Sequence, residues 1–438
     1  MKRMKKISTL CVLLLLAAVR TGAQQRMSLS LDQCREMALE HSETLRQAGN
    51  SLRMAELDRR IATTHLLPGI EASATGVYML PDMDMMGSEL RVRGAYMAGI
   101  TLTQPIYTGG KIMTARKLTR IGEEAAAEQL RMARMDAVAE ADNAYWTLMA
   151  VGNKVAMLES FAAMLDTLHR QTSTAVDAGM TIANDLLRVE ARRSDIAYQL
   201  QKVRNGADMC RMSLCRIIGV DADTQIELTE TTAAAIGEQP LSADMEVRPE
   251  LALLRQQVEA GRQQVRLTQA DMLPTVGLSL GYTYYGNFRL NSMVDVGGGY
   301  YMPYEQEFRD GLGLAMLAVK VPVFHWGENR KKVRKARYEL QNAELELQKN
   351  SRLLELEVQQ AIRNLQDSHR MIATAESGLR QAEENLRVMQ NRYAGAMVAL
   401  TDLLEAQTQW QQAHSNLIEA RAQLKIYETA YLRATGRL

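Results

Sequence analysis

The chain has 438 residues, of which 47% are hydrophobic and 24% are charged, and its formal net charge at pH 7 is +1. The 52 basic and 51 acidic residues nearly cancel, whereas a protein that binds nucleic acid through its overall charge carries a clear basic excess. The composition therefore gives no reason to expect a nucleic-acid partner.

The first 23 residues have the organisation of a secretory signal. Residues 2–6 contain four basic side chains, residues 7–19 are almost entirely apolar, and small residues stand at 21–23, where a signal peptidase would cleave. We predict that residues 1–23 are removed and that the mature chain begins near Gln24. The signal holds five bases and no acids, which leaves 47 bases against 51 acids. Because the apolar run is too short to span a bilayer comfortably, a retained membrane anchor is the weaker alternative.

The mature chain contains no further run of about 18 apolar residues, so a membrane role would require strands. Its three cysteines are Cys34, Cys210 and Cys215, and none follows the signal in a position for lipid attachment. Cys210 and Cys215 lie on different faces of a predicted helix and are not expected to pair. We interpret all three cysteines as small core residues.

One helix is predicted early in each half of the chain. The first begins at a capping box formed by Ser30 and Gln33, runs toward Thr64 and ends before Pro68. The second begins at Pro249, because proline is favoured at the first helical position, and ends before Pro274.

A pair of strands is predicted after each of these helices. Residues 276–284 alternate apolar side chains with small or polar ones, and residues 70–78 do so more weakly. Return strands fit residues 95–104 and 311–321, of which the last is apolar on both faces, so that its pattern leaves the register open.

Very long amphipathic helices follow the return strands. Residues 110–178 would span about 100 Å as one helix, which requires a packed face. Apolar residues at 3,4 spacing supply such a face in both halves. In the second half they are Leu340, Ala343, Leu347, Asn350, Leu354, Val358, Ala361, Leu365, Ser368, Ile372, Ala375, Leu379, Ala382, Leu386, Met389 and Tyr393 in the long helix, and Leu403, Ala406, Trp410, Ala413, Leu417, Ala420, Leu424, Tyr427, Tyr431 and Ala434 in its partner.

Residues 105–219 and 322–436 match at a constant offset of 217, which predicts a duplicated structural unit rather than a solenoid of short modules. We expect a single domain over residues 24–438, made of two repeats at about 28–219 and 248–438. A polar linker with little regular structure, residues 220–247, joins the repeats.

Four strands cannot close a barrel, because lipid does not tolerate unpaired strand edges. Several chains must therefore contribute to one barrel; two would supply eight strands and three would supply twelve. We favour a trimer, although the pattern also permits a dimer. The predicted fold is mainly α with membrane β, in which a trimeric 12-strand β-barrel continues into a long periplasmic α-helical coiled-coil barrel.

Over residues 28–438 the chain resembles the TolC-type outer-membrane efflux proteins. The resemblance is carried by residues 248–251, by the Leu-Pro pairs at 67–68 and 273–274, by the two Pro…Gly junctions after the strands, and above all by residues 392–406. It implies a homotrimer with a twelve-strand barrel, a helical duct and a mixed equatorial region. The family usually has glycine where this chain has Ala396, with Gly395 one residue earlier, so the geometry of the second helix turn stays open.

The resemblance implies a passive exit duct in the outer membrane, with a periplasmic extension, that exports small molecules after docking to a periplasmic adaptor and an inner-membrane pump. We expect no catalytic residue and no cofactor, since no phosphate loop, metal-ligand cluster or nucleophile–base pattern is present in the sequence. A type I protein-secretion duct is an alternative within the same fold. A soluble periplasmic coiled-coil adaptor is an alternative of another class.

Two groups of site residues follow from the resemblance. The helix turns would dock the adaptor through Gly179, Met180, Gly395, Ala396 and Met397, although glycine also suits an ordinary helix end. Carboxylates just inside these turns would form the channel constriction: Asp402, Glu405 and Asp185. A ring of acids selects cations, whereas an aspartate there can also simply cap its helix.

Methionines gather around the first predicted extracellular loop: Met79, Met83, Met85, Met86 and Met97. Thioethers bind Cu(I) or Ag(I), but 27 methionines occur along the chain and commonly fill apolar gaps, so no metal site is predicted. Tyrosines at strand ends are expected to lie near the outer interface of the membrane as an aromatic girdle, or to be ordinary strand residues. These are Tyr282, Tyr284, Tyr285, Tyr300, Tyr301 and Tyr304.

Overall fold

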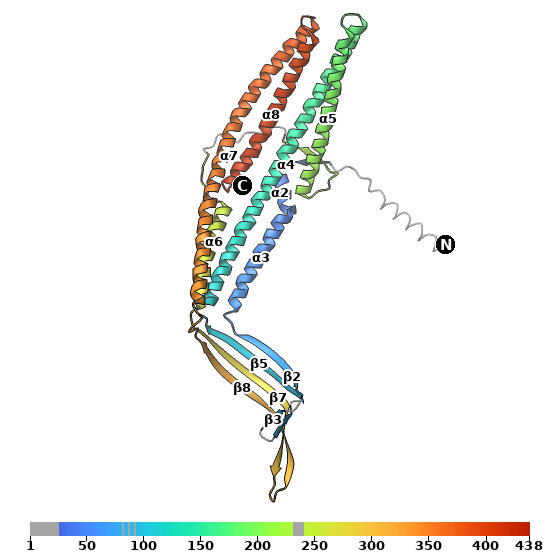
Figure 1. Ribbon diagram of the computed structural model, residues 1–438. Coiled ribbons are helices and arrows are strands. Elements are labelled where there is room, and N and C mark those ends of the chain that lie inside the picture. Colours follow the sequence, from blue (N-terminus) through green and yellow to red (C-terminus); the bar gives the residue numbers. More distant parts are fainter. Residues whose placement is uncertain (1–25, 81–82, 86–87, 92, 231–240) are drawn as a thin grey trace, which may run out of the picture. The chain divides into compact units, whose positions relative to one another are not determined.

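The computed structural model describes residues 26–80, 83–85, 88–91, 93–230 and 241–438 (Figure 1). The predicted signal peptide, residues 1–23, lies outside them. Two compact units are present. We call residues 26–49, 128–252 and 349–438 the helical unit, and residues 50–127 and 253–348 the sheet unit.

The chain is mainly helical, with α2 at Leu31–His41, α3 at Glu43–Thr64, α4 at Lys111–Asp177, α5 at Ala183–Ile218, α6 at Pro249–Ala270, α7 at Glu328–Ala394 and α8 at Leu400–Ala434. Helices α4 and α7 have 67 residues each, as the heptad pattern predicts. The capping box at the start of α2 is confirmed: the Gln33 N–H donates to Ser30 Oγ at 3.3 Å, and the Ser30 N–H donates to Gln33 Oε1 at 3.1 Å.

The single helix predicted from Ser30 toward Thr64 is wrong, because α2 ends at His41 and α3 begins at Glu43. Ser42 adopts an extended backbone at this break, with φ −63° and ψ 114°. Its hydroxyl accepts a hydrogen bond from the Leu45 N–H at 3.2 Å and so caps the new helix.

The core of the helical unit lies where the 3,4 spacing places it. None of the positions predicted for the second half is exposed, and the others are half-buried beside a buried set: Val358, Ala361, Leu365, Ser368, Leu386, Leu403, Ala406, Leu417, Ala420, Leu424, Tyr431 and Ala434. One buried charge connects three helices, since the fully buried Asp142 of α4 accepts two 2.7 Å bonds from Arg35 of α2. The Thr429 hydroxyl of α8 donates a third bond at 2.7 Å. Such a buried carboxylate is tolerated only when it is paired and hydrogen-bonded.

The predicted linker contains one short strand that the sequence analysis did not identify. Strand β6 (Gln225–Leu228) pairs in parallel with β1 (Arg26–Leu29). Two side chains of the helical unit bind the linker backbone: Arg211 donates to the carbonyls of Ala222 and Thr224 at 2.5 and 2.7 Å, and Tyr431 Oη donates to the Ser242 carbonyl at 3.1 Å. Residues 231–240 lie outside the described part of the chain.

Among the described residues, α4 is the one helix whose length and composition would allow it to cross a membrane, with a window of mean hydropathy 1.3. A core helix passes the same test. The side chains of Ala141, Tyr145 and Trp146 in α4 are buried in the largest cluster of the helical unit. Core packing thus accounts for part of the apolar character of α4, because 33% of the apolar window is buried.

The sheet unit contains the four predicted strands as β2 (Gly69–Tyr78), β5 (Arg93–Tyr107), β7 (Thr275–Asp295) and β8 (Tyr301–Lys320). They pair antiparallel in the order β2-β5-β7-β8 and lie side by side in Figure 1. Two short strands, β3 (Met83–Met85) and β4 (Ser88–Arg91), extend the sheet beside the outer part of β7 and were not predicted.

Candidate functional site

The two helix turns have the same backbone. After α4, the Met180 N–H donates to the Ala175 carbonyl at 2.8 Å and the Gly179 N–H donates to the Val176 carbonyl at 2.9 Å. After α7, the Met397 N–H donates to the Arg392 carbonyl at 2.9 Å, and the Ala396 N–H donates to the Tyr393 carbonyl at 3.0 Å. Each is a Schellman motif, in which one left-handed residue lets the chain leave the helix.

Ala396 fills the left-handed position of the second turn, with φ 55°, as Gly179 does in the first, with φ 68°. Gly395 is not left-handed. The sequence left the geometry of the second turn open, and the structure shows that it matches the first turn. An alanine in this conformation costs about 1–2 kcal/mol relative to glycine.

The apolar side chains at the turns are in solvent, with Met180 82% exposed and Met397 77% exposed. The helices behind the turns are packed together in one cluster, in which Leu400 and Leu403 of α8 and Val189 of α5 are buried with Phe161 and Leu165 of α4. Each turn thus presents one exposed methionine next to helices that pack closely together. Their assignment to adaptor docking stays a prediction.

The three predicted constriction acids lie near the starts of α5 and α8 and have local partners. Asp185 is half-buried and accepts a hydrogen bond from Thr181 Oγ1 at 2.7 Å. Exposed Asp402 accepts the Ala399 N–H at 3.3 Å, and exposed Glu405 accepts from Gln409 Nε2 at 3.3 Å. Asp402 therefore helps to cap α8, which was the structural alternative; a ring of acids would need further copies of the chain and stays a prediction.

The strand register assembles one continuous apolar surface, which we call the apolar sheet face. Leu280 of β7 stands opposite Leu102 of β5 and Ala315 of β8, and Leu102 stands opposite Ile70 of β2. Since side chains alternate across a strand, every second residue joins this face. Its members are Ile70, Ala72, Ala74, Ala98, Ile100, Leu102, Leu278, Leu280, Tyr282, Ala315, Leu317 and Val319.

The opposite face of the sheet is polar on three strands, where it carries Glu71, Ser73, Thr75, Thr101, Thr103, Ser279 and Thr283. On β8 this face holds Leu312, Leu314 and Met316 instead. The pairing with β7 therefore settles the register of β8, which its sequence alone left open.

The predicted methionine cluster lies only partly within the described side chains. Met79 and Met97 are both 37% exposed. Met83 and Met85 belong to β3, and Met86 lies outside the described residues. Within the described residues, no group of three or more His, Cys, Asp or Glu could hold a metal ion.

The cysteines are core residues, as predicted. Cys34 and Cys215 are fully buried, Cys210 is half-buried, and all three are free thiols. Burial raises the pKa of Cys34 to about 12, with a smaller contribution from the carboxylate of Asp142. Cys34 therefore stays a protonated thiol at physiological pH and is no nucleophile.

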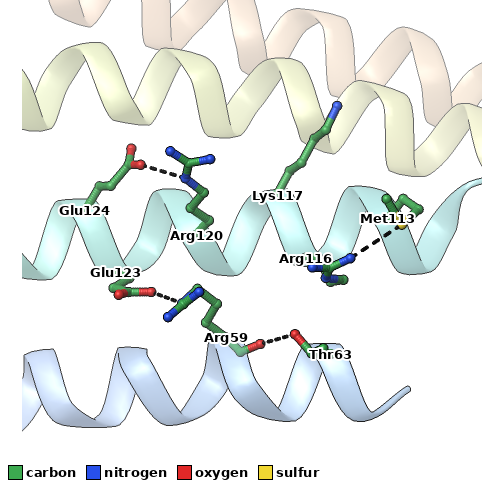
Figure 2. A pocket seen from close by; sticks show the side chains of 8 residues that line it. All are labelled: Arg59, Thr63, Met113, Arg116, Lys117, Arg120, Glu123 and Glu124. Carbon is green, nitrogen blue, oxygen red and sulfur yellow. Dashed lines mark hydrogen bonds and ion pairs between the residues drawn. The ribbon is translucent and has the colours of Figure 1, made fainter. Parts of the chain in front are cut away.

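A groove in the sheet unit lies between α3 and α4 and carries both signs of charge (Figure 2). Arg59 forms an ion pair with Glu123, and Arg120 forms one with Glu124 at 3.0 Å. Lys117 points away from α3. Because most of its charges are already paired across or along the helices, the groove offers no poised acid–base pair.

Comparisons with known proteins agree along almost the whole chain. The family described as outer membrane efflux protein matches residues 34–220 and 242–437. The outer membrane efflux protein BepC of Brucella suis is 22% identical over 430 residues, covering 97% of this chain and 89% of BepC. The protein CyaE of Bordetella pertussis is 24% identical over 421 residues, covering 94% of this chain and 84% of CyaE.

A solved structure has the same fold. The outer membrane protein VceC of Vibrio cholerae superposes with a TM-score of 0.78 at 19% identity, covering 93% of this chain and 96% of VceC. At this identity the likeness concerns the fold.

Proposed function

Because the chain belongs to the outer membrane efflux protein family and so resides in the outer membrane, we propose that it is the passive exit duct of a tripartite efflux system. Three copies would place their sheets edge to edge as a twelve-strand barrel. Their helices would continue into the periplasm as a coiled-coil duct that receives small molecules from an adaptor and an inner-membrane pump. This role needs no catalytic residue and no cofactor.

The apolar sheet face carries the proposal. It runs across all four long strands, and β2 has 10 residues, about the length that spans the hydrocarbon core at a tilt. Among the described residues β2 pairs only with β5, and β8 pairs only with β7. Both outer strands therefore keep an open edge, which lipid does not tolerate. Neighbouring copies of the chain that pair these edges would supply hydrogen-bond partners for the open backbone groups.

The proposal includes two repeats, at about 28–219 and 248–438, joined by residues 220–247. Left-handed backbone recurs at the offset of 217 seen in the sequence: Gly109 with Trp326, Gly110 with Gly327, Gly179 with Ala396, and Gly219 with Gly436. These positions fall at the strand-to-helix junctions, the helix turns and the final helix ends. Duplication of one gene segment would account for these pairs.

Docking to an adaptor is proposed for the helix turns, at Gly179, Met180, Gly395, Ala396 and Met397. Replacing both exposed methionines, Met180→Asp with Met397→Asp, should abolish efflux without loss of folding, because neither side chain is buried. A matched control is Met371→Asp, which changes an exposed methionine within α7. The readout is accumulation of a fluorescent dye in host cells that lack their own copy of this gene.

Dye export by the double variant at the wild-type rate would contradict docking at the turns. The same cells distinguish the two cargo classes, since a type I secretion duct would export a protein and leave dye accumulation unchanged. A soluble adaptor would have no use for an apolar sheet face and should not fractionate with the outer membrane.

A constriction is proposed at Asp402, Glu405 and Asp185, each of which would form a ring of three in the trimer. Such rings favour cations. Asp402→Asn with Glu405→Gln should reduce the cation selectivity of single channels in a planar bilayer, while Asp367→Asn with Glu355→Gln on α7 serves as the charge-matched control. Equal selectivity of the two double variants would refute the constriction.

A further inference from the structure

The second strand-to-helix junction exposes two aromatic rings. Strand β8 ends at Lys320 and α7 begins at Glu328. Between them Phe324 is 67% exposed and Trp326 is 85% exposed, and their rings meet edge to face with centroids 5.0 Å apart. We call Phe324 and Trp326 the aromatic hook. Burial of these rings would be favourable, but the described part of the chain leaves both of them largely exposed.

Trp326 also has an unfavourable backbone. Its φ of 49° is left-handed, a conformation that is a clear outlier for a bulky residue and lowers the population about fivefold to thirtyfold. The equivalent position in the first half is Gly109, which adopts this conformation freely. A large exposed ring on a strained backbone indicates a contact with a molecule outside the chain.

Six basic residues follow within the first three turns of α7: Arg330, Lys331, Lys332, Arg334, Lys335 and Arg337. All six are exposed, while Val333 and Ala336 between them are buried. Lys332 pairs with Glu328 at 2.7 Å and Lys335 with Glu339 at 3.7 Å. Within the described chain the other four bases have no acidic partner, so the surface keeps a strong positive potential.

The aromatic hook and the bases share one surface hollow of about 710 Å³. Its lining consists of Phe324, His325, Trp326, Lys331, Lys332 and Lys335, together with Glu328, whose charge is paired with Lys332. An occupant of this hollow would contact apolar rings and ammonium groups at once.

The first junction has a weaker form of these features. Lys111 pairs with Asp271 at 2.5 Å, and Arg59 and Arg120 of the α3–α4 groove pair with Glu123 and Glu124 (Figure 2). Its left-handed residue, Gly109, has no side chain. The exposed ring there is Tyr107, at 45%, so two largely exposed rings in contact, one of them on a left-handed backbone, distinguish the second junction.

We propose that the aromatic hook and the bases of α7 bind an anionic phospholipid of the inner leaflet. The inference rests on the proposed function, in which β8 crosses the membrane. Trp326 lies six residues after Lys320, the last residue of that strand, and so within reach of the interface. Aromatic rings settle at the headgroup level of a bilayer, and clustered bases attract anionic headgroups. The phosphate would lie among Lys331, Lys332 and Lys335, with the rings at the top of the acyl chains.

The tryptophan content of the chain allows a direct test. The chain has three tryptophans; Trp146 is 4% exposed in the helical unit, and half-buried Trp410 packs on Phe161 there. Trp326 is therefore the ring open to lipid. The protein is reconstituted in phosphatidylcholine vesicles with phosphatidylglycerol, with bromine on the acyl chains of one lipid or the other, and tryptophan emission is recorded.

Brominated phosphatidylglycerol should quench emission more than brominated phosphatidylcholine at equal mole fraction, and Trp326→Phe should remove the quenching. Lys331→Gln with Lys332→Gln and Lys335→Gln should lower the preference for phosphatidylglycerol at least about fivefold. The control triple Lys202→Gln, Lys349→Gln and Arg363→Gln removes three exposed bases of the helical unit and should leave the preference unchanged. Excess inorganic phosphate should not compete.

Three results would overturn the proposal. Equal quenching by both lipids would show insertion without headgroup recognition. Emission insensitive to lipid bromine would place the ring in water or beneath a neighbouring protein. Competition by inorganic phosphate would indicate a site for small anions. Channel conductance in a planar bilayer is measured on the same samples and should be normal in every variant. Absence of conductance in the wild-type protein would contradict the proposed duct. The quenching result would still report on lipid binding at Trp326.

Discussion

The two strand-to-helix junctions share left-handed backbone and differ in the side chains that surround it. Gly109 and Gly110 have φ of 65° and 84°, and Trp326 and Gly327 have φ of 49° and 73°. At the first junction a Cβ on Gly109 would lie 2.8 Å from both the Ala270 carbonyl oxygen and Leu273 Cβ. At the second, the Trp326 side chain projects into open space. The passage from strand to helix thus sets the dihedral angles, and the surroundings decide which residue is acceptable.

The helix turns extend this comparison. A Cβ on Gly179 would meet nothing within 4 Å, and the equivalent Ala396 carries its Cβ without a clash. Dihedral angle alone therefore favours glycine at the turns, whereas both angle and space require it at Gly109.

The largest effect is expected at the first junction. Gly109→Ala should lower the free energy of unfolding by about 3 kcal/mol. The alanine would be left-handed, and its Cβ would lie only 2.8 Å from the Ala270 carbonyl oxygen. Gly110→Ala is the matched control, since its φ is also positive but nothing lies within 4 Å of the new Cβ; it should cost about 1 kcal/mol. Guanidinium titrations followed by helical circular dichroism in detergent measure both. Equal losses of stability in the two variants would mean that the close contacts around Gly109 contribute nothing.

A smaller, reciprocal effect is expected at the helix turns. Gly179→Ala should destabilise the protein by about 1 kcal/mol, and Ala396→Gly should stabilise it by about as much. The same titrations apply, and Gly395→Ala, at a residue that is not left-handed, is the control. The equivalence of the two turns fails if both exchanges change stability in the same direction.

The smallest effect is expected at Trp326. Trp326→Gly relieves the left-handed strain and loses one ring contact with Phe324. These terms oppose each other, so stability should change by less than about 1 kcal/mol. Lipid quenching of tryptophan emission should nevertheless disappear. A loss above about 2 kcal/mol would identify Trp326 as a packing residue and remove the reason to assign it to lipid.

Regular features were predictable from the sequence, because their signals are local. The capping box at Ser30, the buried face containing Leu403 and Leu424, and the strand at Val276 follow from spacing over a few residues. Two features were not predicted: β1 and β6 pair across some two hundred residues, and the helix breaks at Ser42, a residue type that also occurs within helices.

The candidate site was predicted unevenly. The turn residues and acids came from the family resemblance, but no residue preference places an alanine or a tryptophan in left-handed backbone, so neither Ala396 nor Trp326 was expected there. Two signals in the sequence could have located the second junction. One is the run of six bases after Gly327, and the other is the alignment of Trp326 with Gly109 at the offset of 217.

The central claim is that one chain cannot complete its membrane wall. Native mass spectrometry of the mature protein, released from detergent after outer-membrane extraction, tests this most directly. The account predicts a complex of three times the mass of the mature chain, formed only when detergent or lipid is present. A monomer that stays soluble in buffer without detergent would contradict it.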